Sequence, residues 1–177
     1  MTNAAQHSNL LPNPLTADRS GYHLYVTIEG QNQGYFKSDL TGTNRIPAIG
    51  YSFGGIAPLD ASTGHSTGVR KYQPVVITKA FGPSTAQCLS AMSSNESIKS
   101  VFIEFLKTVG VEEKVYCTVK LSDVSISDIR HMAGIAHPDQ PLWPAEAEAV
   151  SFAFRKIELR HVASETSFQD DLGVGVT

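Results

Sequence analysis

The sequence predicts a mainly β protein, a small antiparallel β-barrel with one short α-helix and long protruding loops. Apolar and polar residues alternate with a period of two over most of the middle of the chain, which is the pattern of strands with one buried face. One short segment instead has apolar residues at helical spacing. Three connections between strands are long for a compact domain. The 177 residues correspond to about one domain.

The predicted strands each place apolar side chains on one face. In the first strand, apolar residues occupy every second position from Tyr22 to Ile28. In the last strand the apolar parity shifts between Phe154 and Ile157, which predicts a bulge, a common device where a sheet curls into a barrel. The predicted strands are Tyr22–Glu29, Ile46–Gly54, Tyr72–Ala80, Ile98–Leu106, Tyr116–Val124 and Glu148–Leu159.

A short helix is predicted where the segment Gly82–Met92 interrupts this alternation. Ser84 is the expected N-cap, because its hydroxyl can accept a hydrogen bond from a free amide of the first turn. Cys88, Leu89 and Met92 fall on one helical face. This apolar stripe is expected to lie as a lid over an open end of the barrel.

The two ends of the chain differ from the middle. Residues 1–20 are rich in Asn, Pro and Ser and predict a flexible N-terminal arm; residues 164–177 predict a flexible C-terminal tail. The Asp170–Asp171 pair in this tail is expected simply to be solvated. The β-barrel domain is therefore expected to span residues 21–163.

Composition excludes several classes of function. A formal net charge of −3 provides no field to attract phosphate, so nucleic acid and anionic membranes are not expected partners. No apolar run approaches the length of a membrane span, and the first residues do not form a secretory signal peptide, so folding in the cytoplasm is expected. Cys88 and Cys117 are too few for a disulfide framework and are expected to be buried thiols.

The long connections are Gly30–Arg45, Gly55–Lys71 and Ala133–Ala147. Loops beyond about 12–15 residues are usually functional or disordered. Gly55–Lys71 contains several glycines and few formal charges, so it is too polar for a core and too weakly charged to stay extended by self-repulsion. It can be a lid over an active site or an element that docks on another subunit.

Catalytic motifs are not found in the sequence. It has no phosphate-binding loop and no Gly-x-Ser-x-Gly elbow, and the six histidines lack metal-ligand spacing. His131 and His137 flank a loop and can converge, but no carboxylate partner is evident. Trp143, between two prolines, is more typical of a loop anchor than of a ligand platform. We therefore expect a protein that is not an enzyme and holds no cofactor or metal.

From about Tyr22 to Val162, the chain resembles the haemolysin-coregulated protein (Hcp) family, the inner-tube subunit of bacterial type VI secretion systems. The order and spacing of the segments carry this resemblance, because each is weak alone. These segments are Tyr22–Glu29, Ile46–Phe53, the loop residues Thr63-Gly64 and Thr67-Gly68-Val69-Arg70, Val76–Lys79, Pro83–Ala91, Ile98–Leu106, Tyr116–Val124 and Glu148–Leu159.

The resemblance implies that subunits form six-membered rings, which stack into a hollow tube inside a contractile sheath. It implies that the tube is propelled out of the cell and carries or chaperones small effectors in its lumen. The implied partners are other copies of the chain, the sheath and spike proteins, and effectors. The Gly55–Lys71 loop, which matches the family's protruding loop in position, is expected to contact a neighbouring subunit. Its candidate contact residues are Asp60, Ser62, Thr63, Gly64, His65, Thr67, Gly68, Arg70 and Lys71.

Other functions stay open at this level. A stand-alone β-sandwich that binds sugar or protein would be a monomer with aromatic residues clustered at one loop end. A small barrel enzyme would need His131, His137 and a carboxylate to converge. A tail-tube-like subunit of another contractile injection system would share the physics of the first hypothesis.

Overall fold

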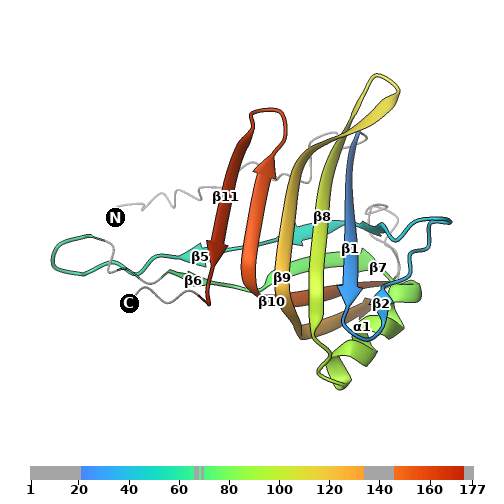
Figure 1. Cartoon of the computed structure of the whole chain (residues 1–177), viewed down its shortest axis with the longest axis horizontal. Helices are drawn as coiled ribbons and strands as arrows, with labels where there is room; N and C mark the ends of the chain where they lie inside the picture. Colours follow the sequence, from blue (N-terminus) through green and yellow to red (C-terminus); the bar gives the residue numbers. More distant parts are fainter. Residues whose placement is uncertain (1–20, 66–67, 69, 134–145, 174–177) are drawn as a thin grey trace, which may run out of the picture.

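The computed structural model describes residues 21–65, 68, 70–133 and 146–173. In this part of the chain, a strongly curved antiparallel sheet is accompanied by one helix and a two-stranded ribbon (Figure 1). The predicted fold class is confirmed. The elements are β1 (Tyr22–Gly30), β2 (Gly34–Tyr35), β3 (Ile46–Ala48), β4 (Gly50–Ser52), β5 (Gly55–Ile56), β6 (Lys71–Tyr72), β7 (Val75–Ala80), α1 (Pro83–Ser93), β8 (Ile98–Val109), β9 (Glu112–Ala133), β10 (Glu146–His161) and β11 (Thr166–Asp171).

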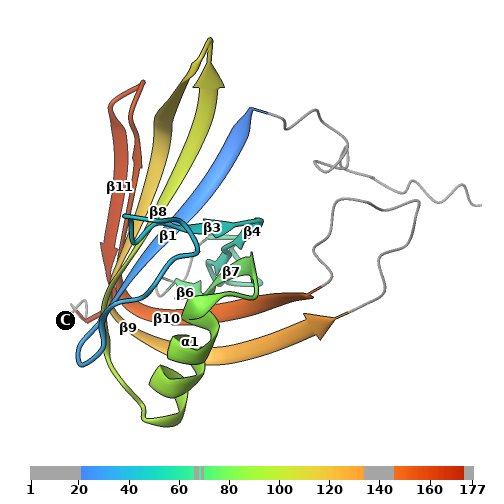
Figure 2. The same ribbon diagram turned by 90° about the vertical axis from the view of Figure 1, so that its right-hand side faces the viewer.

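Four strands form the body of the sheet in the order β1–β8–β9–β10. β10 pairs with β9 along its length, while its other edge pairs first with β7 and then with β11. Figure 2 shows β9 and β10 bending together, so that the sheet folds over its own inner face. That face holds the apolar core, which includes Val26, Ile28, Ile77, Ile98, Ile103, Leu121, Val150, Phe152 and Ile157.

The strand predicted over Ile46–Gly54 is divided into β3 and β4, which pair with different partners. β3 pairs with β1, whereas β4 pairs with β7 at the opposite end of the strand order. Ile49, between them, donates its amide to the carbonyl of Thr78 and leaves its side chain 48% exposed. This short segment thus links the two edges of the curved sheet, as a barrel requires.

The parity shift predicted in the last strand is present, but its form differs from the predicted bulge. Phe154 is partly buried and Ile157 is fully buried, and the facing residues of β9, Val124 and Leu121, are offset in the same way. Both strands shift together, and Asp123 adopts a φ of 51° there, which Asp tolerates better than most residues. The register shift itself lies between Ser151 and Phe152.

The helix forms where predicted, but its cap is Gly82 rather than Ser84. The Gly82 carbonyl accepts the amide of Thr85 at 3.0 Å, and the Gly82 amide donates to the Thr85 hydroxyl at 3.1 Å. Pro83 occupies the first helical position, where its missing N–H costs nothing. Ser84 is buried in the first turn, so it is the second residue of the helix and not its N-cap.

The buried face of α1 also differs in part from the prediction. Cys88 and Ala91 are buried against the sheet, while Leu89 is 39% exposed. The helix contacts β9 and lies beside the bend of the sheet (Figure 2). Cys88 and Cys117 are both free thiols, but Cys117 is only partly buried, so the predicted burial is correct for the first cysteine alone.

The Gly30–Arg45 connection packs on the body and contains β2. Phe36 is fully buried, and the carboxylate of Glu96 accepts hydrogen bonds from the amides of Asn32 and Gln33 at 2.7 and 2.9 Å. A Cβ on Gly30 would lie 2.5 Å from Glu96 Oε1, so a larger residue there would displace the Glu96 carboxylate from this position. This long connection is therefore a packed part of the domain.

The predicted flexible C-terminal tail is wrong for six of its residues. Thr166–Asp171 form β11, which pairs with Lys156–His161 of β10 in a continuous antiparallel ladder. β11 pairs along an edge of β10 that would otherwise be unpaired, and the backbone groups of such an edge need hydrogen-bond partners. The predicted N-terminal arm, residues 1–20, lies outside the described residues.

Candidate subunit-contact surface

The segment predicted to contact another subunit projects from the body as a hairpin. Its base is the ribbon of β5 and β6, in which Gly55 pairs with Tyr72 and Ile56 with Lys71. We call residues 55–71 the projecting hairpin. Figure 1 shows it extending away from the sheet, beside the end of β11.

The tip of the projecting hairpin is organised around Asp60. The Asp60 carboxylate accepts hydrogen bonds from the hydroxyl of Ser62 and from the amides of Ser62 and Thr63, at 2.5, 2.8 and 2.9 Å. These bonds, with the Ser62 hydroxyl first, lower the pKa of Asp60 to about 2. The Asp60 amide donates to the carbonyl of His65, and the Gly64 amide donates to the Asp60 carbonyl, both at 2.8 Å. The tip therefore has a defined turn.

The base of the projecting hairpin is attached to the C-terminal strand. Arg70 donates two hydrogen bonds to the carboxylate of Asp170, with Nε–Oδ2 and Nη2–Oδ1 distances of 2.5 and 2.6 Å. The hydroxyl of Tyr72 donates to the same carboxylate at 2.7 Å. The bonds from Arg70 and then Tyr72 lower the pKa of Asp170 to about 2. Burial, followed by the bond to Asp170, raises the pKa of Tyr72.

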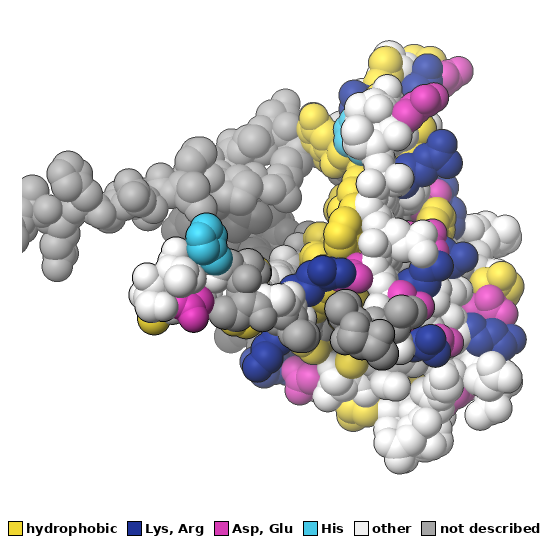
Figure 3. All heavy atoms as spheres, turned by 60° about the vertical axis from the view of Figure 1, so that its left-hand side comes forward, with side chains coloured by type: hydrophobic (Ala, Val, Ile, Leu, Met, Phe, Trp, Pro, Cys, Tyr) yellow, Lys and Arg dark blue, Asp and Glu magenta, His cyan; other side chains and the backbone are white. Residues whose placement is uncertain are grey.

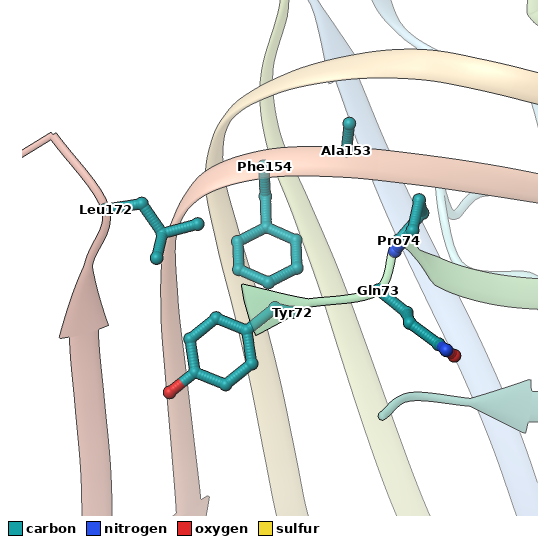
Figure 4. Close-up of a pocket in the computed structure, with 6 residues that line it drawn as sticks. All are labelled: Tyr72, Gln73, Pro74, Ala153, Phe154 and Leu172. Carbon is teal, nitrogen blue, oxygen red and sulfur yellow. The ribbon is translucent and has the colours of Figure 1, made fainter. Parts of the chain in front are cut away.

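A shallow apolar hollow lies next to this attachment. Its volume is about 90 Å³, well below the roughly 300–1,000 Å³ of a typical small-molecule site. The ring of Tyr72 packs 5.5 Å from that of Phe53 and 6.2 Å from that of Phe154, measured between centroids. Figure 4 shows Tyr72, Phe154 and Leu172 converging from different elements. These contacts hold the base of the hairpin against the sheet.

Apolar side chains on the projecting hairpin face solvent. Ile56 and Leu59 are 59% and 65% exposed. In Figure 3, hydrophobic side chains also gather on the side of the sheet that faces the hairpin, whereas charges of both signs are spread over its outer side. Exposed apolar surface commonly marks a protein contact where it gathers into a patch.

The predicted contact residues divide between the tip and the base. Asp60, Ser62, Thr63, Gly64 and His65 form the tip turn, and Gly68 is exposed with a φ of 107°. Arg70 and Lys71 lie at the base, and Thr67 lies outside the described residues. Sequence reasoning missed Asp170, the partner of Arg70. No local pattern of buried residues marks its strand, because Thr166 and Phe168 are both exposed; Asp170 was expected simply to be solvated, whereas it is only 8% exposed.

His131 lies beside a carboxylate, that of Glu148, but this carboxylate is already bonded to other residues. His131 Nε2 lies 3.1 Å from Oε2 of Glu148, and His137 and Trp143 lie outside the described residues. Glu148 also forms an ion pair with Lys79 and accepts the Thr85 hydroxyl at 3.0 Å. Among the described residues, no three His, Cys, Asp or Glu side chains are grouped as a metal site. Within the same residues, no helix has the length and apolarity to cross a bilayer.

The structure defines a small antiparallel β protein with one helix and a projecting hairpin. The family model described as "Type VI secretion system effector, Hcp" matches residues 25–161. The chain belongs to the Hcp family, which confirms the family predicted from the sequence.

Relatives of known description agree. The "Major exported protein" of Pseudomonas aeruginosa is 33% identical over 162 residues, covering 83% of this chain and 93% of the relative. A crystal structure of an Hcp protein matches with a TM-score of 0.79 and 24% identity, covering 87% of this chain and 99% of that chain. The secreted protein Hcp3 of Pseudomonas aeruginosa matches with a TM-score of 0.65 and 28% identity, covering 84% and 98%.

Proposed function

We propose that the chain is a structural subunit of a type VI secretion tube. Copies form six-membered rings, the rings stack into a hollow tube, and the tube carries or chaperones effectors when it is propelled outward. Membership of the Hcp family is the observation that carries this proposal. The projecting hairpin supports it, because a tube subunit needs surfaces that contact other copies.

The proposed route is from the cytoplasm to the cell exterior. The relative named "Major exported protein" supports export. The proposed partners are other copies of the chain, the sheath and spike proteins of the machine, and small effectors. The role is structural and not enzymatic, without a cofactor, nucleic acid or membrane insertion.

The projecting hairpin is the proposed subunit contact. Ile56 and Leu59 are the exposed apolar side chains that a neighbour would cover. The defined turn at Asp60 and the attachment at Arg70 reduce the conformational entropy lost on association. An obligate contact typically buries about 2,000 Å² or more, so the hairpin is expected to act together with other surfaces.

Electron microscopy and light scattering of the purified chain test this function. Rings or tubes are expected, and a monomer at all micromolar concentrations would reject the proposal. Deleting Ser62–Gly68 should preserve the strand signal in circular dichroism but weaken assembly, because the hairpin contributes little to the core. If the deleted chain assembles like the parent, the hairpin is not the contact; if it unfolds, the hairpin belongs to the core.

A pair of substitutions provides a matched comparison. Leu59→Ser removes an apolar side chain that is 65% exposed on the hairpin. Leu89→Ser removes one that is 39% exposed on α1. We expect the first to weaken assembly and the second to leave it unchanged. Equal effects of the two would contradict a contact specific to the hairpin.

A further inference from the structure

We propose that Asp170 is a positioning residue that fixes the direction of the projecting hairpin, so that the C-terminal strand sets the geometry of subunit contact. The consequence for assembly rests on the proposed function. The positional role itself concerns the isolated subunit and can be measured there.

The ribbon at the base of the projecting hairpin is too short to orient it alone. β5 and β6 have two residues each and form a sheet of their own, separate from the main sheet. A two-stranded ribbon is marginal in water on its own even when it is longer, and a backbone bond from the Gln73 amide to the Gly54 carbonyl at 2.9 Å links this one toward the β4–β7 pair. The packing of Tyr72 on Phe53 and Phe154 holds the base of the ribbon, and a directional attachment of the strand that leads to the tip would fix the hairpin further.

β11 can provide that attachment, because it is itself paired with the main sheet. Six residue pairs join it to β10, from Lys156–Asp171 to His161–Thr166. The Leu172 amide also donates to the carbonyl of Arg155 at 2.8 Å. The strand thus moves with the main sheet and transmits its position to whatever is bound to it.

Asp170 is the residue of β11 that bonds to the hairpin. It is 8% exposed, whereas the four preceding residues of β11 are exposed. Its carboxylate accepts hydrogen bonds from Nε and Nη2 of Arg70, which is 100 positions away in the sequence, and from the hydroxyl of Tyr72. A bidentate charge-assisted pair fixes direction as well as distance, and the third bond holds Tyr72, the last residue of β6.

The neighbouring acidic residue has different partners and is a natural control. Asp171 accepts hydrogen bonds from Arg155 Nε at 3.3 Å and from the Gly173 amide at 2.9 Å. The contact with Arg155 holds the end of the strand to β10, and neither contact reaches the hairpin. Asp171→Asn therefore removes a carboxylate from the same strand without removing a bond to the hairpin.

Amide hydrogen exchange tests the positional role, measured below the concentration at which the chain assembles. We expect Asp170→Asn to accelerate amide exchange in the paired residues 55–56 and 71–73 on the order of tenfold, the loss expected for a strong charge-assisted pair. Arg70→Gln should act similarly, and its exposed side chain makes it safe for folding. The double variant should add little to either, and Asp171→Asn should leave the hairpin unchanged.

Assembly is then compared for the same four variants. Support requires that the variants with a mobile hairpin also need more protein to assemble, at unchanged strand signal. Unchanged exchange in Asp170→Asn, fully additive effects in the double variant, or a mobile hairpin with parental assembly would each overturn the inference. A parent chain that never assembles would reject the proposed function, while the exchange data would still decide whether Asp170 positions the hairpin.

Discussion

Replacing Glu148 with glutamine should destabilise the fold strongly, because it leaves a buried ammonium without its counter-charge. Lys79 and Glu148 are 2% and 0% exposed and form an ion pair between β7 and β10. Removing one partner of a buried pair typically costs about 3–5 kcal/mol. For a chain of this length, each kcal/mol shifts the melting temperature by about 2–4 °C. The expected decrease in melting temperature is therefore roughly 6–20 °C.

The remaining contacts of the pair do not compensate for this loss. Lys79 also donates to the carbonyl of Ala80 at 3.2 Å and to the hydroxyl of Thr85 at 3.3 Å. Both acceptors are neutral, and neutral acceptors form weaker bonds with an ammonium than a carboxylate does. The free energy of unfolding should accordingly fall in guanidinium titrations followed by circular dichroism.

Two further variants separate the buried charge from a general effect of mutation. The double variant Lys79→Met with Glu148→Leu should recover most of the stability, since apolar replacement of a buried pair is often neutral. Asp128→Asn breaks the exposed pair with Arg130, whose N–O distance is 2.9 Å, and should cost less than about 1 kcal/mol. A loss of less than about 1 kcal/mol for Glu148→Gln as well would refute the argument from burial.

The remaining predictions concern titratable groups. Burial, with the charge of Glu148 adding to it, raises the pKa of Cys88 to about 12, so Cys88 should resist thiol reagents at pH 8 until the chain is denatured. Burial also raises the pKa of the partly buried Cys117, which should react slowly but before Cys88; rapid reaction of Cys88 in the folded chain would contradict its burial. Asp170 has a folded pKa of about 2, below its ordinary 3.8. Its contribution to stability is therefore complete above pH 4 and is lost as the pH falls through about 2. Asp170→Asn should flatten the acid-unfolding curve in that range, and an unchanged curve would count against this assignment.

Much of the fold follows from period-two alternation. The strands around Val26, Ile103 and Val150 were predicted because one face of each is buried and the other is polar. The division at Ile49 could not be predicted in this way, because a change of pairing partner leaves the local pattern of apolar residues unchanged. β9 also continues to Ala133, beyond the predicted end at Val124. This extension was not predicted, because the outer part of the strand is largely exposed and polar.

The buried charges of Lys79 and Glu148 interrupt the apolar alternation of their strands, and this interruption is itself a signal in the sequence. Lys79 continues the buried parity of Val75 and Ile77, and Glu148 that of Val150 and Phe152. A charged residue in a buried position requires a partner, and two strands that each carry one, of opposite sign, are candidates for pairing. The register, in which Glu148 faces Lys79, shows that this reasoning would have aligned β7 with β10.

The C-terminal strand has a different cause, which no local pattern contains. β10 is long enough to pair with β7 over its first half, and this leaves the same edge of its second half without a partner. The segment Thr166–Asp171 has mostly exposed side chains, so it forms a strand because that edge offers backbone partners and not because it has an apolar face. The same edge places Asp170 beside Arg70. The position of the projecting hairpin thus depends on a strand whose own formation depends on the length of β10.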